Sequence, residues 1–445
     1  MMLIPKEQAV STRIPRAQQV AAAVIGNAFE WYDFVVFGFV SVIIARLFFP
    51  ASNEYAALLL TLATFGVGFF MRPVGAVVLG MYADRAGRKA ALQLVILLMT
   101  IAVAMVAFAP TYVSIGIGAP ILIVLARLLQ GFATGGEFSS ATSFLVECAP
   151  PHRRGLFGSL QMVGQGLATL LGALSGVIMT RGLAPEQLYA WGWRLPFLLG
   201  LLIGPVGIYI RRHVDETEEF QAHRRESPRP LALGAMLREH TRALAASFLL
   251  SVCGTIAYYV VLVYMPTYAK TQFALPLGDA FTVQTVALAW MIVLIPLFGL
   301  LSDWIGRKPV LVGGILGYFL LPYPLLSWVQ IEPSFMRLLC LQLAMCSVLA
   351  VFSGTVSTAL AEQFPTGARS TATGIAYNFA VMLFGGFAPF IVVWLTKETG
   401  SSHVPAFFIM FGATAGAVGI SLLTEERHPV SAVSSTLAGV TASDS

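Results

Sequence analysis

The sequence predicts an all-α membrane protein of about twelve transmembrane helices, arranged as two pseudo-symmetric six-helix halves. The prediction depends on an apolar composition, on regularly spaced apolar runs and on an internal repeat. Of the 445 residues, 57% are hydrophobic and only 11% are charged, whereas roughly 25% of the residues of soluble proteins are charged. So few charges cannot cover a soluble fold of this length, and lipid must therefore surround most of the chain.

The apolar runs are each long enough to cross a bilayer, which takes about 20 residues of helix. In the first half of the chain they lie at 20–48, 56–81, 90–109, 119–147, 155–180 and 192–211. In the second half they lie at 243–270, 280–301, 309–329, 334–362, 370–396 and 403–424. The first run carries Glu30 and Asp33, which the apolar core of a cleavable signal peptide would not tolerate.

The distribution of basic residues predicts the orientation. Most of the 27 Lys and Arg residues fall in the segments that are cytoplasmic if the N-terminus is inside, so both termini are expected in the cytoplasm of a bacterial inner membrane. The expected domains are an N-terminal tail (1–19), a six-helix half (20–211), a cytoplasmic linker (212–242), a second half (243–424) and a disordered tail (425–445).

Two short motifs recur in the same order and at nearly the same offset. GMYADRAGRK (80–89) is repeated as GLLSDWIGRK (299–308), and VECAPPHRRG (146–155) as AEQFPTGARS (361–370). A duplicated six-helix unit explains both pairs. Transporters built from such repeats place their substrate site between the two units.

Each copy of the first motif places an acid at a helix end beside several basic residues. An acid near a helix N-terminus is favoured by the helix dipole, and the cluster could hold the cytoplasmic helix ends together in one conformation and release them in another. The alternative is that the basic residues only anchor the topology. The predicted cytoplasmic gate comprises Gly80, Asp84, Arg85, Gly87, Arg88, Lys89, Asp303, Gly306, Arg307, Lys308, Glu147, Arg154, Glu362 and Arg369.

With these residues in view, the chain resembles the major facilitator superfamily, in which the loop between helices 2 and 3 has the pattern G-x-x-x-D-R-x-G-R-[KR]. The second copy departs from it at Trp304. The segments GNAFEWYDFVVFGF (26–39), FGVGFFMRPVGAVVLG (65–80), RLLQGFATGGEF (127–138) and WGWRLPFLLG (191–200) resemble the metabolite:proton symporters, a family that includes citrate, oxoglutarate, shikimate and betaine/proline carriers. YYVVLVYMPTYAKT (258–271) is most similar to citrate and tricarboxylate carriers.

Charged residues within the apolar runs indicate where transport takes place. A charge at a helix centre costs at least ~2.5 kcal/mol on insertion scales, so it should line a cavity or have a partner. At ~1.5 Å per residue, Asp33 and Arg127 come to similar depth, and Glu30 and Arg72 to a second level nearby. The acids could exchange protons while the arginines bind an anion. Alternatively, Glu30–Arg72 and Asp33–Arg127 are permanent structural pairs.

The candidate site contains both kinds of group. The expected substrate-binding residues are Arg127, Arg72, Gln130, Gln161, Gln165, Tyr258, Tyr377 and Asn378, and the expected proton-coupling residues are Asp33, Glu30 and Glu137. A structural hydrogen-bond role for Glu137 and an interfacial anchoring role for the tyrosines are the alternatives.

The sequence contains no P-loop, zincin motif or nucleophile elbow, and its four cysteines lack pairing or metal-ligand spacing. We therefore expect no enzymatic activity, no metal, no cofactor other than the proton gradient and no nucleic-acid partner, and we expect the chain to act as a monomer in the lipid bilayer. The predicted function is proton-coupled uptake of a small organic anion such as citrate. The alternatives are an osmolyte (betaine/proline) symporter, a drug/proton antiporter or a non-transporting membrane sensor.

Overall fold

The computed structural model describes residues 16–50, 53–86, 88–135, 137–201 and 238–424, and the regular structure of these residues is helical. Within them, nine helical stretches are long and apolar enough to cross a membrane, or ten if the bent pair in the first span is counted as one. The shorter apolar helix Leu94–Ala107 and the helical segment 195–201 stand at the two remaining predicted spans. The predicted all-helical membrane fold is confirmed.

The N-terminal half contains the first six spans. Its main helices are α1 (Arg16–Phe39), α2 (Ser41–Phe48), α3 (Glu54–Ala86), α4 (Arg88–Ala107), α6 (Gly118–Ala133), α7 (Glu137–Glu147) and α8 (Arg154–Gly182). The short helices α5 (Tyr112–Ile115) and α9 (Pro185–Ala190) lie in the connections. The predicted linker lies outside the described residues except for 238–242, as do the predicted C-terminal tail and residues 1–15.

The C-terminal half contains the other six spans. Its helices are α13 (Thr241–Tyr258), α14 (Met265–Phe273), α15 (Leu277–Ile305), α16 (Arg307–Leu320), α17 (Pro322–Ile331), α18 (Phe335–Ala361), α19 (Thr366–Ala380), α20 (Ala388–Thr399) and α21 (Val404–Leu422). Proline at the start of α17 divides the predicted run 309–329, because proline is favoured in the first turn of a helix and cannot donate to a preceding one.

Four further predicted runs are interrupted where the sequence pattern suggested continuous helices. The first span bends by 68° between α1 and α2. The fourth stops after Ala133, at the sequence TGG (134–136), because glycine is a poor helix former. The seventh and eleventh spans each contain a π-helical turn, η3 (Tyr259–Tyr264) and η4 (Val381–Gly385). π-Turns within α-helices occur most often at functional sites.

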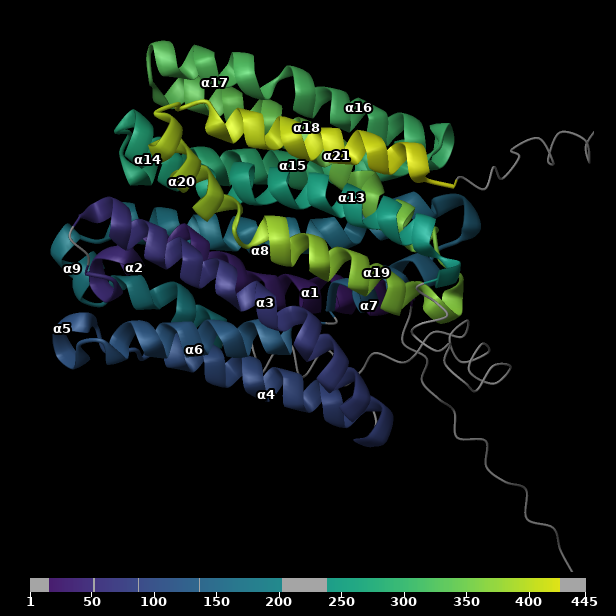
Figure 1. Cartoon of the computed structure of the whole chain (residues 1–445), viewed down its shortest axis with the longest axis horizontal. Coiled ribbons are helices and arrows are strands. Elements are labelled where there is room, and N and C mark those ends of the chain that lie inside the picture. Colours follow the sequence, from purple (N-terminus) through teal and green to yellow (C-terminus); the bar gives the residue numbers. More distant parts are fainter. Residues whose placement is uncertain (1–15, 51–52, 87, 136, 202–237, 425–445) are drawn as a thin grey trace, which may run out of the picture.

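The two halves lie side by side along the length of the bundle (Figure 1). Helix α8 of the N-terminal half packs against α15 and α18, α7 packs against α19, and α3 packs against η4 and α20. Below, the end of the bundle that holds Asp303 and Arg307 is named the motif end, and the opposite end is named the far end. The halves touch at both ends, and the candidate site lies between these two regions of contact.

Candidate functional site

Two buried arginines meet around one aromatic ring inside the N-terminal half. Arg127 on α6 and Arg72 on α3 are 0% and 3% exposed. The guanidinium carbon of Arg127 lies 4.2 Å from the ring centroid of Phe34 on α1, and that of Arg72 lies 4.4 Å from the same centroid. Cations at this distance from an aromatic face are attracted to it. The sequence predicted that these two arginines lie at nearby depths, and both contact this ring.

Further rings complete this arginine–aromatic cluster. Arg127 also lies against Phe37 and Phe65, and Arg72 against Phe69 and Trp31, with distances to the centroids between 4.5 and 5.2 Å. Aromatic contacts attract a guanidinium, but they accept few of its five N–H groups. The cluster therefore holds the two cations while leaving hydrogen-bonding capacity for another group.

Arg127 retains unused donors. Its Nη1 donates to Oε1 of Gln130 at 2.5 Å, whereas Nε and Nη2 have no hydrogen-bond partner among the described residues. The Nε2 atom of Gln130 is likewise unpartnered there. Buried donors without acceptors are costly, and a buried cation without a hydrogen-bonded counter-ion is costlier still. An incoming carboxylate would supply the acceptors that this guanidinium lacks.

Asp33 lies close to the cluster but faces elsewhere. It is buried on α1, and among the described ion pairs none joins it to Arg127. Its Oδ1 atom packs against Gly200, where any side chain would collide with it, and has no described hydrogen-bond partner. The side chains of the other two candidate acids, Glu30 and Glu137, lie outside the described residues, although their backbones belong to α1 and α7.

A cavity with an empty volume of about 440 Å³ lies between the halves. It is lined by helices from both sides, through Trp31, Phe138, Met162, Gln165, Leu250, Ser251, Gly254, Thr255, Tyr258, Tyr259, Phe352, Ser353, Val356, Leu360 and Tyr377. Three of the predicted binding residues are among them, namely Gln165, Tyr258 and Tyr377. None of these lining residues is charged. That volume includes space open to solvent, and the part that the centre of a water-sized sphere can reach is about 40 Å³, which holds a few water molecules. The cavity must therefore widen to admit an organic acid.

The cavity wall offers polar atoms that lack partners. Nε2 of Gln165, Oγ of Ser251, Oγ1 of Thr255 and the hydroxyl of Tyr259 are buried without a hydrogen-bond partner among the described residues. Buried polar groups are nearly always satisfied in native proteins, by protein, water or ligand. Such a group of unpartnered atoms around one cavity is what a binding site for a polar ligand would present.

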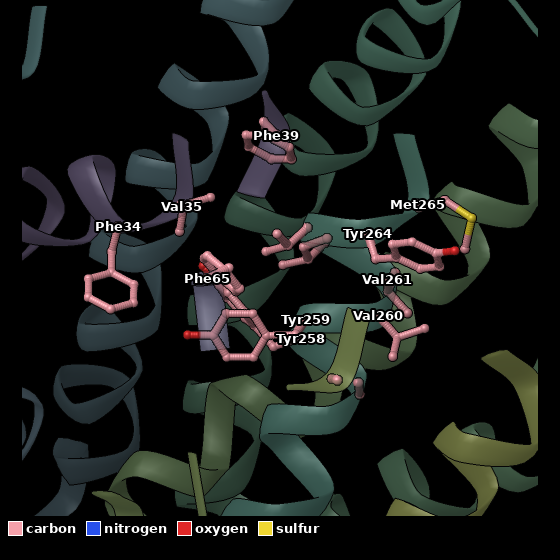
Figure 2. Close-up of a cluster of buried hydrophobic side chains, with 14 of the residues drawn as sticks. Phe34, Val35, Phe39, Phe65, Tyr258, Tyr259, Val260, Val261, Tyr264 and Met265 are labelled. Atoms are coloured by element: carbon pink, nitrogen blue, oxygen red, sulfur yellow. The ribbon is translucent and has the colours of Figure 1, made fainter. Parts of the chain in front are cut away.

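A single aromatic layer separates this cavity from the arginines. Trp31 lines the cavity and also contacts Arg72, while the ring of Tyr259 lies 5.9 Å from Phe65 and 5.5 Å from Phe69. Figure 2 shows Phe65 next to Tyr258 and Tyr259, with Phe34 beyond. Gln165, Tyr258 and Tyr377 therefore line the cavity, whereas Arg72 and Arg127 lie behind this layer.

The remaining predicted binding residues have other surroundings. Gln130 belongs to the arginine cluster, and the buried Gln161 does not line the cavity, although both atoms of its side-chain amide are unpartnered within the described part. Asn378 donates across the halves to the carbonyl of Gly135 at 2.6 Å. Beside it, Tyr377 stacks on Phe138 with ring centroids 3.6 Å apart. Asn378 and Tyr377 thus join the halves between the cavity and the motif end.

Sequence reasoning missed several residues of the cavity wall, including Ser251 and Thr255. A signal was present, because these two hydroxyl residues stand four apart in an otherwise apolar run and Tyr258 follows at the next turn. Residues spaced in this way share one face of a helix. Phe352 and Ser353 gave no comparable signal, since the hydroxyl residues of α18 follow one another closely and fall on several faces of the helix.

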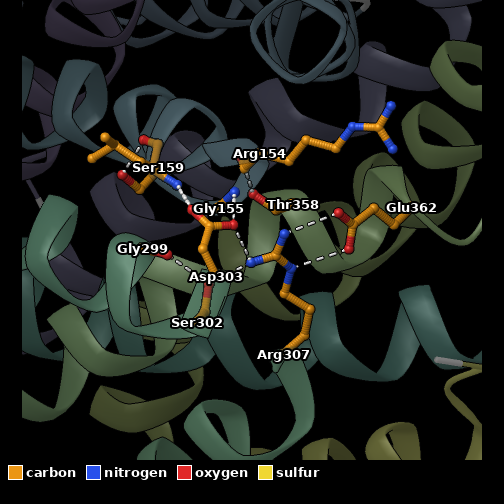
Figure 3. A network of polar contacts seen from close by, with 10 residues as sticks. Arg154, Gly155, Ser159, Gly299, Ser302, Asp303, Arg307, Thr358 and Glu362 are labelled. Atoms are coloured by element: carbon orange, nitrogen blue, oxygen red, sulfur yellow. Dashed lines mark hydrogen bonds and ion pairs between the residues drawn. The ribbon is translucent and has the colours of Figure 1, made fainter. Parts of the chain in front are cut away.

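At the motif end, the second copy of the GRK motif joins the two halves (Figure 3). The carboxylate of Asp303 accepts hydrogen bonds from the backbone amides of Gly155 and Leu156, at 2.7 and 3.0 Å, in the first turn of α8. Arg307 donates to Asp303 at 2.8 Å and, through two nitrogens, to Glu362 at 3.0 and 3.1 Å. An acid from one half therefore caps a helix of the other.

Two glycines are required by this geometry. Gly306 has φ +94°, in the region that favours glycine, and it allows the chain to turn directly from α15 into α16. A Cβ atom on Gly155 would lie only 2.5 Å from both Nη1 of Arg307 and Oγ of Ser302, and it would also collide with the carbonyl of Gly299. Helix α8 can approach the C-terminal half this closely only without a side chain at 155.

The second predicted pair of segments provides another bond between the halves. Arg369 donates to Glu147 at 3.2 Å and to the carbonyl of Ala361 at 3.0 Å. The carbonyl of Arg154 accepts from Thr358 at 3.1 Å, so Arg154 contributes its backbone to the contact. Lys308 follows Arg307 in the first turn of α16. In the first copy of the motif, Gly80 belongs to α3, and Gly87 lies outside the described residues. The side chains of the four charged residues of this copy also lie outside them, namely Asp84, Arg85, Arg88 and Lys89.

The far end is joined by fewer polar contacts in the described part. Arg181, at the end of α8, pairs with Asp279 in the first turn of α15 at 2.8 Å, and the two side chains are 53% and 37% exposed. Ser41 on α2 and Thr267 on α14 share a hydrogen bond of 3.4 Å. Phe39 and Phe281 meet edge to face at 5.9 Å.

Comparisons with known proteins agree with this architecture. The family model of the Major Facilitator Superfamily matches residues 23–377. The citrate-proton symporter of Salmonella typhi is 36% identical over 398 residues, which cover 89% of this chain and 92% of that protein. The proline/betaine transporter of Salmonella typhimurium is 32% identical over 424 residues, which cover 92% of this chain and 84% of that protein.

Among solved structures, the xylose transporter XylE from E. coli, in a partially occluded inward open conformation, superposes with a TM-score of 0.72 at 20% identity. The match covers 91% of this chain and 96% of that one, and it supports the fold alone. With the family model matching most of the sequence, these findings identify the chain as a multi-pass membrane transporter that belongs to the major facilitator superfamily.

Proposed function

We propose that this chain is a proton-coupled symporter that takes up a small organic anion, citrate or another di- or tricarboxylate, across the bacterial inner membrane. In this proposal both termini and the motif end face the cytoplasm, and the proton gradient is the only energy source. The halves would rock about the central cavity and expose it to each side in turn. The chain would work as a monomer.

The observation that carries the proposal is the pair of unused donors on the buried guanidinium of Arg127. A carboxylate binds arginine through two parallel hydrogen bonds, which suits an anion better than a sugar or an apolar drug. Arg72, which contacts the same ring of Phe34, would bind a second carboxylate of the substrate. The similarity to citrate-proton symporters supports the same substrate class.

Proton coupling needs a carboxyl whose protonation depends on the bound anion. Asp33 is the candidate whose side chain the structure describes: it is buried, unpaired by any described ion pair and close to the cluster that would receive the anion. An anion that binds Arg127 neutralises the nearest positive charge, and loss of that charge favours the protonated carboxyl. Anion and proton would then cross together, with Glu30 and Glu137 as the further candidates.

A second substrate class is favoured by a specific observation, the wall of the cavity itself. Trp31, Tyr258, Tyr259 and Tyr377 surround it without a described charge, and aromatic faces attract methylated ammonium groups. A zwitterion such as glycine betaine could place its ammonium in the cavity and its carboxylate toward the arginines. The similarity to proline/betaine transporters supports this alternative.

Uptake into proteoliposomes tests both. Labelled citrate, tricarballylate, oxoglutarate and glycine betaine would be supplied with and without an inward proton gradient. Gradient-stimulated accumulation of one acid supports the anion symporter, and accumulation of betaine alone supports the zwitterion. Export of amphipathic drugs against the gradient, without uptake of any of these solutes, would contradict both.

The Arg127→Ala variant tests the site within the same assay. Each hydrogen bond between the guanidinium and a carboxylate contributes about 1.5–3 kcal/mol to binding. Uptake at low substrate concentration should therefore fall by at least about tenfold. Arg337→Ala is the matched control, because Arg337 lies in the first turn of α18 and pairs with the exposed Glu332. Normal uptake by Arg127→Ala, with both variants present in the membrane, would rule out Arg127 as the anion ligand.

A further inference from the structure

The π-helical turn of the seventh span is held from outside by a buried side chain. All six residues of this turn, Tyr259–Tyr264, are at most 3% exposed. A π-turn within an α-helix displaces the regular hydrogen-bond pattern, and an unsatisfied carbonyl in such a place cannot turn to water. A hydrogen-bond donor from another element can satisfy a carbonyl that is displaced from the regular pattern in this way.

Gln342 on α18 provides such a donor. Its Nε2 atom donates to the carbonyl of Val261, in the middle of the turn, at 3.0 Å, and also to Oε1 of Gln284 on α15 at 2.5 Å. Both glutamines are 1% exposed. The buried amide of Gln342 thus bridges a backbone carbonyl of the seventh span and the side-chain oxygen of Gln284 on α15. An apolar side chain would serve better at either position if the seventh span were a regular α-helix, because burying an amide is costly.

Two tyrosines at the start of the turn face the cavity, Tyr258 directly before it and Tyr259 as its first residue. Figure 2 shows Tyr258 and Tyr259 on the side of the turn next to Phe65, and Val260 and Val261 on the opposite side. Tyr258 shares a hydrogen bond of 2.5 Å with Thr169 of the other half, and both tyrosines line the cavity. The amide pair therefore supports, from behind, the wall on which substrate would bind.

The turn also fixes the rotation of the next helical segment. Each residue advances an α-helix by about 100°, so one residue more or less rotates everything after it by that angle relative to everything before it. Thr267, which bonds Ser41 at the far end, follows the turn, whereas Thr255 and Tyr258 precede it. The cavity wall and the far-end contact keep their relative orientation only while the turn persists.

We propose that Gln342, oriented by Gln284, is a positioning residue that holds the π-turn of the seventh span and thereby aligns the cavity tyrosines with the far-end contact of Thr267. Gln342 does not itself line the cavity. Its effect on uptake rests on the proposed function, but its effect on the alignment does not.

Disulfide formation between cysteines placed at Ser41 and Thr267 measures that alignment without any substrate. The exposed or partly exposed Cys148 and Cys340 are replaced by serine in the background. Gln342→Leu should slow cross-linking by about tenfold, because it removes the donor and lets the turn relax toward an α-helix that carries Thr267 away from Ser41. Cys346→Ala, one turn further along α18 and equally buried, is the control for a loss of packing and should cross-link like the parent.

Gln342→Glu provides the rescue. At pH 6 a protonated carboxyl can donate to the carbonyl of Val261 while the amide of Gln284 turns to donate in return. We expect Gln342→Glu to cross-link at a rate within about threefold of the parent. For Gln342→Leu, we expect uptake with a raised KM and a largely retained maximal rate, since the tyrosines contribute to substrate binding.

Equal cross-linking by Gln342→Leu and the parent would overturn the proposal, as would an equal loss in Cys346→Ala. If Gln342→Leu fails to reach the membrane, the cross-linking rates of Gln342→Glu and Gln284→Leu are compared instead. A rate near that of the parent in Gln342→Glu, with a slower rate in Gln284→Leu, supports the positioning role. Equal rates in the two variants contradict it. Failure of the wild-type chain to take up citrate or betaine would contradict the proposed function while leaving the cross-linking result valid.

Discussion

The two ends of the bundle are closed in different ways. At the motif end, the side chain of Asp303 is 2% exposed and bonds two backbone amides of the other half, while Arg307 joins it to Glu362. At the far end, the ion pair described between the halves is more than a third exposed on each side and stands beside a hydroxyl contact and edge-to-face rings.

The difference teaches which end should open more readily. Exposed ion pairs contribute little to stability, whereas breaking a buried network leaves uncompensated charges. The energy that separates the conformations of the transporter should therefore lie mainly at the motif end. Three substitutions test that comparison, from the largest expected effect to the smallest.

Asp303→Asn should have the largest effect. The amide keeps the shape of the carboxylate but presents a donor to the amides of Gly155 and Leu156 and leaves Arg307 without its nearest counter-charge, which costs about 3–5 kcal/mol for a buried pair. We expect the motif end to open and uptake to fall by at least tenfold, roughly. Maleimide labelling of a cysteine at the buried Ser159, with Cys148 and Cys340 replaced by serine, should rise. Unchanged labelling would mean that Asp303 does not hold the halves together.

Gly155→Ala should have an intermediate effect. The added methyl group meets the carbonyl of Gly299 and two side chains, so α8 must move away from the C-terminal half, and overpacking typically costs about 1–3 kcal/mol. A decrease in uptake of about threefold to tenfold is expected, measured beside Gly182→Ala, whose new methyl group meets nothing within 4 Å. Equal rates for the two variants would show that the helices are not in tight contact during transport.

Arg181→Ala should have the smallest effect. Because the pair with Asp279 is exposed, its loss should be worth about 0.2–1 kcal/mol and change uptake by less than about fivefold, with a difference that shrinks as salt is added. Uptake at two ionic strengths measures this. A loss larger than that of Asp303→Asn would reverse the comparison between the ends.

Much of the fold could be predicted from the sequence, because lipid requires helices of a fixed length and the repeat divides them into two halves. The approach of Arg127 and Arg72 followed from helix rise alone. Their shared contact with Phe34 did not, since depth along a helix says nothing about its rotation. The π-turn at Tyr259–Tyr264 was also missed, because the apolar run that contains it carries no signal for it and the side chain that bonds it, Gln342, lies far away in the sequence.

Asp33 illustrates a further limit. A carboxyl and a guanidinium at similar depth suggested an ion pair, but Asp33 packs against Gly200 on a helix that the depth argument did not consider. Similarly, the second motif copy predicted a charged contact at the helix ends, yet the groups that Asp303 binds in the other half are backbone amides. Sequence patterns reveal side-chain chemistry well, but they do not reveal which backbone groups that chemistry meets.

That backbone contact has a consequence for how this transporter can change over evolutionary time. The backbone N–H groups of residues 155 and 156 can bond Asp303 whichever side chains these two positions carry, provided that the side chain at 155 fits the space there. Substitution of Asp303 therefore has no compensating partner across the halves, and covariation should link it to Arg307 and Glu362 but not to the helix that it caps. This tie between the halves would remain invisible to contact prediction based on paired mutations.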